Sequence, residues 1–191
     1  ITITVHGIAG HSGVAPQNGA SAIVMAARAI ESLYANGWLG RVEKPGLGVG
    51  SANVGVIQGG DATNVITPLV TLKAEARSHD AVMRGRIVAE IRAAFDKAAS
   101  SVTNAMGQAG SIEFESRVDY EAFALADDDP SVIAGEAAVR AVGREPFRNI
   151  SDGGLDANWL FRHGIPAVTI GCGQRNIHTA DERLCIADYL D

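Results

Sequence analysis

Residues 1–9, ITITVHGIA, are the clearest guide to the fold, because their side chains alternate between apolar and polar. A period of two residues is typical of a β-strand with one buried face. A glycine-rich turn over residues 10–13 ends this pattern, and Pro16 and Asn18 then introduce a helix. Its apolar residues recur at spacings of three and four, at Ala20, Ile23, Val24, Ala27 and Ile30. The opening therefore predicts a strand followed by an amphipathic helix.

Three further strands and a second helix are predicted before residue 118. Residues 50–58 have the composition of a partly buried strand, and in residues 65–78 apolar side chains alternate with charged ones. Asp80 can cap a helix with an apolar stripe over residues 82–98, and residues 112–118 alternate again. The order predicts a ferredoxin-like βαββαβ domain, a four-stranded antiparallel sheet with two helices on one face.

After residue 117 the pattern changes. A helix is predicted after Asp129, a short strand over residues 146–150, a short helix over residues 155–162 and an apolar strand over residues 167–170. Strands that alternate with helices are typical of a parallel α/β sheet, but so few strands cannot cover both faces of one. We therefore expect an α+β domain over residues 1–117, followed by an incomplete α/β segment over residues 118–191.

The composition restricts the class of protein. Apolar residues make up 47% and charged residues 20%, which is typical of a globular protein. The net charge of −6 gives no basic surface for nucleic acid or an anionic membrane. No apolar run approaches the roughly 18 residues of a membrane helix, so we expect neither partner. Cys172 and Cys185 are too few for a disulfide framework, and we interpret them as buried thiols in the reducing cytoplasm.

The chain begins in the middle of a predicted strand and without methionine. We expect it to be a fragment of a longer protein.

Three candidate site residues lie at the ends of strands in the first half. His11, on a glycine-rich turn, is an accessible imidazole that can donate to a carbonyl oxygen, or it is only a surface histidine. Asn64 can hold a substrate carbonyl or carboxylate, or form an Asx turn. Arg77 suits bidentate binding of a carboxylate, with a surface ion pair as the alternative.

In the second half, His178 lies on a polar loop that follows an apolar segment. Ligands of open α/β sheets bind at such carboxyl ends of strands. The imidazole can bind a metal, with Asp181 or Glu182 as a hydrogen-bond partner that fixes its tautomer. Alternatively the loop only starts a helix, with Thr179 and Glu182 forming a capping box.

Gly153 and Gly154 form a turn just before a predicted helix. Their backbone N–H groups can face a ligand at the helix N-terminus. A role confined to starting the helix is the alternative.

Taken in order, several short motifs resemble the M20 family of metallopeptidases. Each motif is weak alone, but their order across nearly the whole chain is a strong signal, and the peptidase T-like (tripeptide aminopeptidase-like) branch is the most similar. The motifs are His11-Ser12-Gly13-x-x-Pro16, Gly59-Gly60-x-Ala62-x-Asn64-Val65, Glu75-Ala76-Arg77-Ser78, Gly153-Gly154-x-Asp156-Ala157-Asn158, Gly164-Ile165-Pro166 and His178-Thr179-x-x-Glu182.

The resemblance implies a lid or dimerisation domain over residues 1–117, inserted into a catalytic α/β domain with two divalent metals, usually zinc. It implies a homodimer that hydrolyses short peptides with a metal-bridging water and a glutamate as general base. The implied roles are metal ligand for His178, oxyanion stabilisation in the partner subunit's active site for His11, and substrate contacts for Asn64, Arg77, Gly153 and Gly154.

The family's other metal ligands and its glutamate base have no counterpart in this sequence, so the chain alone should be inactive. Two alternatives remain open. One is an N-acyl-amino-acid deacylase or amidohydrolase of the same family, which Arg77 does not distinguish from a peptidase. The other is a non-catalytic ferredoxin-like module that dimerises through its sheet edge and binds a small amino acid, which leaves His178 without a role.

Overall fold

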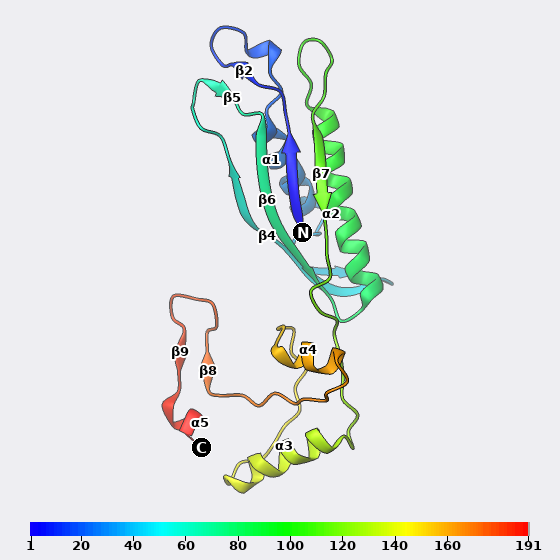
Figure 1. Cartoon of the computed structure of the whole chain (residues 1–191), viewed down its shortest axis with the longest axis vertical. Helices are drawn as coiled ribbons and strands as arrows, with labels where there is room; N and C mark the ends of the chain where they lie inside the picture. The colour runs from blue at the N-terminus through cyan, green and yellow to red at the C-terminus, as the bar shows by residue number, and fades with distance from the viewer. Residues whose placement is uncertain (191) are drawn as a thin grey trace. The chain divides into compact units, whose positions relative to one another are not determined.

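The computed structural model describes residues 1–190. The chain divides into two compact units, Ile1–Asp119 and Tyr120–Asp191, called unit 1 and unit 2 below (Figure 1). No helix within residues 1–190 is long and apolar enough to cross a membrane.

Unit 1 is built on a five-stranded antiparallel sheet (Figure 1). β1 lies between β6 and β7, with Ile3 opposite Leu72 on β6 and Phe114 on β7. β4 carries a bulge between Val54 and Val56 where it pairs with β6. In spatial order the strands are β3 (Gly40–Lys44), β4 (Gly48–Gly59), β6 (Leu69–Arg77), β1 (Thr2–His6) and β7 (Ser111–Glu115).

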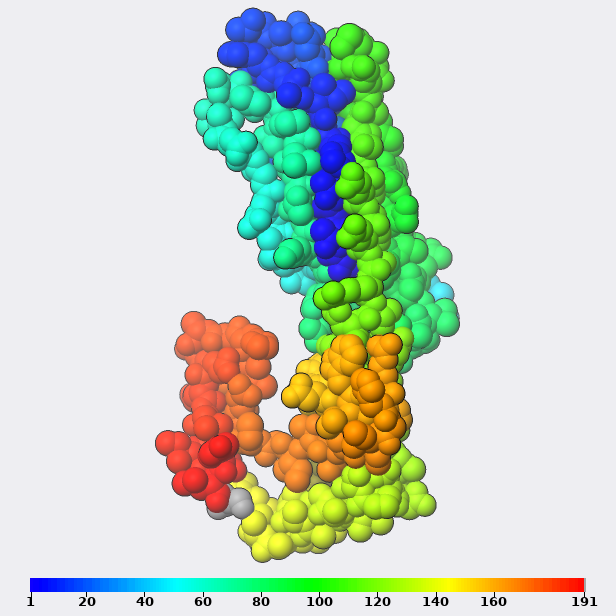
Figure 2. Space-filling model, in the orientation of Figure 1, coloured from blue at the N-terminus to red at the C-terminus, as the bar shows by residue number. Residues whose placement is uncertain are grey.

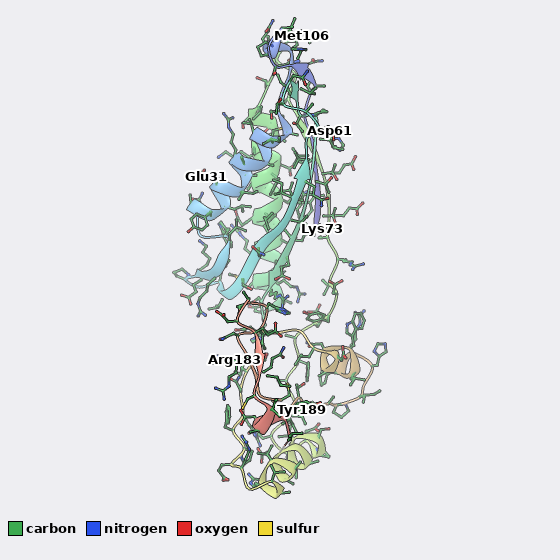
Figure 3. The ribbon with its side chains drawn as sticks, turned by 90° about the vertical axis from the view of Figure 1, so that its left-hand side faces the viewer. Glu31, Asp61, Lys73, Met106, Arg183 and Tyr189 are labelled. Atoms are coloured by element: carbon green, nitrogen blue, oxygen red, sulfur yellow. The ribbon has the colours of Figure 1, made fainter. Side chains whose placement is uncertain are left out.

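Two helices, α1 (Ala22–Ala35) and α2 (Ala81–Ser101), cover one face of this sheet (Figures 1 and 3). Each begins at a side-chain cap: Ser21 accepts the Val24 N–H, and Asp80 accepts the Val82 N–H at 2.8 Å. The apolar residues of the helices and strands meet in one core. Its largest fully buried side chains are Phe95, Ile3, Met25, Leu33, Leu72, Met83, Ile87, Ile91, Val5, Val42 and Val70.

The predicted ferredoxin-like arrangement is confirmed, because four of the strands follow the spatial order second, third, first, fourth. The prediction of only four strands is wrong, since β3 forms a hairpin with β4 through the turn Pro45–Leu47. β3 was missed because it is short and buries a single residue, Val42, which gives no two-residue period.

A second, two-stranded sheet lies at one end of unit 1, where β2 (Gly10–His11) pairs with β5 (Val65–Ile66). The short 3-10 helix η1 (Pro16–Asn18) follows β2. Gly19 packs directly on Ile66, because a Cβ atom on Gly19 would lie 2.6 Å from Ile66 Cδ1. We call this region, residues 10–19 and 60–66, the tip.

Unit 2 has much less core. Among its described residues only Ala157 is buried. Ion pairs also hold its segments together, since the Arg148 guanidinium pairs with the carboxylates of Asp127 and Glu136. Its elements are α3 (Pro130–Ala141), α4 (Asp156–Arg162), the paired strands β8 (Gln174–Arg175) and β9 (Arg183–Leu184), and α5 (Ile186–Leu190).

The strands predicted over residues 146–150 and 167–170 are not formed. A strand needs a neighbour that pairs with its backbone, and none lies beside these segments within residues 1–190, so Val168 and Ile170 stay exposed. The prediction that both cysteines are buried is wrong for Cys172, which is exposed, while Cys185 is half-buried.

Candidate functional site

The tip brings together two candidates that are 53 residues apart in sequence. His11 lies opposite Val65 in the β2–β5 pair. The Ser12 N–H donates to the Asn64 carbonyl oxygen at 3.0 Å, and the Ser12 hydroxyl donates to the Thr63 carbonyl oxygen at 3.4 Å. The side chains of His11 and Asn64 are both exposed. They therefore form one accessible polar patch on unit 1.

The His11 ring is held by its own loop. Its Nδ1 accepts hydrogen bonds from the N–H groups of Gly13 and Val14, both at 3.1 Å. The loop is closed by the Ala15 N–H, which donates to the His11 carbonyl oxygen at 3.2 Å. Within residues 1–190 the ring's other nitrogen, Nε2, makes no hydrogen bond. The imidazole is thus fixed on one side and open on the other.

A loop after α2 braces this region. Asn104 is buried, and its amide donates to the Asn18 carbonyl oxygen while its Oδ1 accepts the N–H groups of Met106 and Gln108. The Ala105 N–H donates to the Gln17 carbonyl oxygen at 2.8 Å. Figures 2 and 3 show the tip and the loop after α2 at the same end of unit 1, and Figure 3 labels Asp61 and Met106 there.

This brace could not be predicted from the sequence. Asn104 is 86 residues from Asn18, and by itself it reads as an ordinary turn residue.

Arg77 lies away from the tip. It ends β6, whose first residue Leu69 is next to the tip, so the strand separates them by roughly 26 Å. The guanidinium makes two hydrogen bonds to Glu75, Nε to Oε1 at 3.2 Å and Nη2 to Oε2 at 2.8 Å. Within one copy of unit 1, Arg77 and His11 therefore do not form a common site.

His178 lies in the turn between β8 and β9 of unit 2, with a φ of 63° that is uncommon outside glycine. Its backbone N–H donates to Glu182 Oε2 at 2.8 Å. This bond, with a second from the Gln174 side chain, lowers the pKa of Glu182 below its ordinary value. Glu182 therefore holds the His178 backbone, rather than the ring as the sequence suggested.

The capping-box alternative for this loop is also not formed. The Thr179 hydroxyl accepts the Asp181 N–H at 3.2 Å and donates to Asn176, but the next helix, α5, begins only at Ile186. Thr179 therefore stabilises a turn, and it leaves the His178 imidazole exposed.

The residues of this chain do not fit a metal centre by themselves. No group of three or more His, Cys, Asp or Glu residues within the described part of the chain is arranged to hold a metal ion. A catalytic zinc site normally uses three protein ligands. His178 can therefore supply at most one ligand of a larger set.

Gly153 and Gly154 both make local contacts within unit 2. The Gly153 N–H donates to the Ser151 hydroxyl at 3.1 Å. A Cβ atom on Gly154 would lie 1.7 Å from the Tyr120 hydroxyl oxygen, so a side chain there would require the Tyr120 ring to move. The helix α4 that follows begins after Leu155, whose N–H donates to Asn158 Oδ1.

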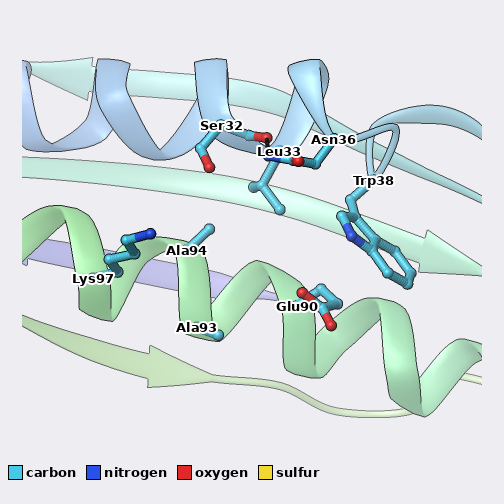
Figure 4. A pocket seen from close by; sticks show the side chains of 8 residues that line it. All are labelled: Ser32, Leu33, Asn36, Trp38, Glu90, Ala93, Ala94 and Lys97. Carbon is cyan, nitrogen blue, oxygen red and sulfur yellow. Dashed lines mark hydrogen bonds between the residues drawn. The ribbon is translucent and has the colours of Figure 1, made fainter.

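A hollow of about 260 Å³ lies on the helical face of unit 1, between α1 and α2 (Figure 4). Trp38 lies at one end, with the Lys44 ammonium 4.5 Å from its ring centroid. None of the candidate site residues lines this hollow. The residues that line it are Ser32, Leu33, Asn36, Trp38, Glu90, Ala93, Ala94 and Lys97.

Comparison with known proteins identifies relatives along the whole chain. "Uncharacterized protein YqjE" of Bacillus subtilis (strain 168) is 34% identical over 190 residues, which are 100% of this chain and 47% of that protein. A tripeptidase from Staphylococcus aureus subsp. aureus Mu50 is 32% identical with a TM-score of 0.79, and aminopeptidase PepT from Bacillus cereus ATCC 10987 is 35% identical with a TM-score of 0.72. Each structural match covers 99% of this chain and 47% of the other.

The chain thus spans about half the length of these relatives. Residues 1–103, more than half of the chain, match the peptidase dimerisation domain. This chain therefore belongs to the M20 peptidase family.

Proposed function

We propose that this chain is part of an exopeptidase that hydrolyses short peptides. The observation that carries the proposal is the likeness to a tripeptidase and an aminopeptidase over 99% of the chain. In this proposal residues 1–117 are the dimerisation (lid) domain, and residues 118–191 are the last part of the catalytic domain. Both cysteines are free, in keeping with the reducing cytoplasm that we propose as the location.

The exposed apolar side chains of unit 2 support its assignment to a larger domain. Trp159, Phe161 and Ile165 are exposed, and among the described residues of unit 2 Ala157 alone is buried. A segment with so little buried surface gains little hydrophobic stabilisation of its own. We propose that the remainder of the catalytic domain, outside this chain, covers these side chains.

We assign the site residues as follows. The open Nε2 side of His11 suits an oxyanion-stabilising donor, which would act in the partner subunit's active site. His178 would be one ligand of a divalent metal, for which we propose two zinc ions in the whole enzyme, and the missing ligands would come from outside this chain. The substrate would be contacted by Asn64, Arg77, Gly153 and Gly154. Arg77 would act in a different active site from the His11 of the same chain.

The first prediction concerns substrate and metal. The enzyme that carries this chain should hydrolyse tripeptides with a kcat/KM about tenfold or more above that for N-acetyl amino acids. His178→Ala should remove this activity and lower the bound zinc measured by mass spectrometry, because it deletes a ligand. His79→Ala is the control, because it makes the same substitution at an exposed histidine of unit 1 to which we assign no role in the site, and it should leave both unchanged.

Faster hydrolysis of N-acyl amino acids would favour the deacylase alternative. A zinc-loaded enzyme that cleaves neither substrate class would leave the non-catalytic binding module as the better account.

A homodimer is the second part of the proposal, and β4 provides its surface. β3 pairs with β4 only from Gly48 to Ala52. Within residues 1–190, no strand pairs with the outer edge of β4 over residues 53–59. Ile57 on this edge is 53% exposed. Ile23 of α1, which is also exposed, lies near Gly60, the residue that follows β4. An unpaired edge with apolar neighbours is a template for another strand, here from a second copy.

The second prediction follows from that edge. Ile57→Lys should weaken self-association about tenfold or more, because it brings two like charges together across the twofold axis. Sedimentation equilibrium at micromolar concentration measures the effect. Val82→Lys, at a residue of α2 that is 78% exposed, is the matched control and should not change the association. A wild-type chain that is monomeric at high micromolar concentration would contradict the proposed dimer.

A further inference from the structure

We infer that, whenever the His11 ring is neutral, the loop around it selects the tautomer with the proton on Nε2. Two backbone N–H groups, those of Gly13 and Val14, point at Nδ1 at 3.1 Å. A backbone N–H can only donate a hydrogen bond, so Nδ1 must offer its lone pair. In a neutral imidazole the proton then resides on the other nitrogen.

His163 provides the opposite case in the same chain. Its Nδ1 lies 2.7 Å from the Trp159 carbonyl oxygen. A carbonyl oxygen can only accept, so Nδ1 of His163 carries the proton. The same backbone chemistry therefore assigns opposite tautomers to His11 and His163.

Contacts on both sides of the loop keep the two amides aimed at the His11 ring. Before the amides, the Ser12 N–H is tied to the Asn64 carbonyl oxygen. After them, the Ala15 N–H is tied to the His11 carbonyl oxygen, and η1 is held by Asn104 and Ala105. Ring rotation or a proton on Nδ1 would break two hydrogen bonds for which the loop offers no replacement.

The tautomer determines what His11 can do. Its Nε2–H is a donor for a developing negative charge on oxygen. It cannot serve as a general base in this state, because Nε2 already carries a proton and the Nδ1 lone pair is used by the loop. This consequence for catalysis rests on the proposed function, whereas the tautomer does not.

Long-range ¹H–¹⁵N correlation spectra of the full chain, recorded where the imidazoles are neutral, test the inference. We expect the Nε2–H pattern for His11 and the Nδ1–H pattern for His163, each assigned by the loss of its signals in a His→Gln variant. Val14→Pro removes one of the two donors and should shift the His11 Nδ1 resonance. Val14→Ala keeps the N–H at a residue that is 79% exposed, and should not shift it.

A proton on Nδ1 of His11, or a freely exchanging mixture of tautomers, would overturn the inference whatever the enzyme's activity. If the wild type shows the Nε2–H pattern but the His11→Ala enzyme keeps full activity, the tautomer is upheld and the proposed catalytic role is overturned. The failures of the two proposals are therefore distinguishable. The wild-type spectrum decides the tautomer even if Val14→Pro does not fold.

Discussion

His11→Ala in the enzyme that carries this chain should lower kcat by about 10²- to 10³-fold and change KM little. The expected loss corresponds to one donor that acts on charge developed only in the transition state. Peptide hydrolysis at saturating and at limiting substrate separates the two parameters. His79→Ala is the control for the same chemical change elsewhere in unit 1. A raised KM with unchanged kcat would assign His11 to substrate binding instead.

Conservative variants sharpen this result. Glutamine can place an amide N–H near the position of Nε2, so His11→Gln should retain part of the activity. Asparagine is shorter and reaches only the position of Nδ1, so His11→Asn should behave like alanine. Equal activities for the two amides would argue against a donor at Nε2.

A mixing experiment tests whether His11 acts in the partner subunit's site. His11→Ala and His178→Ala variants should each be inactive, but a heterodimer of the two contains one complete site. Random exchange of equal amounts should then restore about a quarter of the wild-type activity. Mixing that restores nothing, although exchange is shown by mass spectrometry, would place His11 in the site of its own chain.

The elements of unit 1 were predictable where burial is periodic. β1 buries Ile3 and Val5 and leaves its threonines half-buried, and α2 presents its buried residues on one stripe, so the spacing of apolar residues gives the correct element. β3 was not predicted, because a strand with a single buried residue shows no two-residue period. Its place in the sheet depends on the hairpin with β4, which is a property of the turn and the partner strand.

Unit 2 was predicted less well for a related reason. An apolar segment such as residues 167–170 becomes a strand only if another strand satisfies its backbone groups. The sequence shows the apolar residues but not whether a neighbour exists, and the described residues supply none.

The candidate site was predicted in part. Residue type and position singled out His11 and Asn64, and the β2–β5 pair does place them together. The amides that hold the ring, and the Asn104 brace behind them, come from loop conformation and from contacts between distant residues. Neither produces a periodic pattern in the sequence from which it could be predicted.

Phe95→Ala should destabilise unit 1 by about 3–5 kcal/mol, because it removes the largest fully buried side chain of the core and leaves a cavity. Phe95 is 1% exposed on α2, and the core to which it belongs contains residues of both helices and the sheet, so a close-packed core of this kind relaxes only in part around the space. Phe95→Leu should cost less, since leucine keeps part of the packed volume.

Urea unfolding measures this loss, with Trp38 as the reporter in a Trp159→Phe background, because Trp38 packs against the core of unit 1. The midpoint should fall by about 2 M if the slope is that of a small domain. Val82→Ala removes an exposed side chain from the same helix and should change stability by no more than about 0.5 kcal/mol. Since a domain is stable by only about 5–15 kcal/mol, a change below about 1 kcal/mol for Phe95→Ala would mean that α2 does not pack on the sheet through this residue.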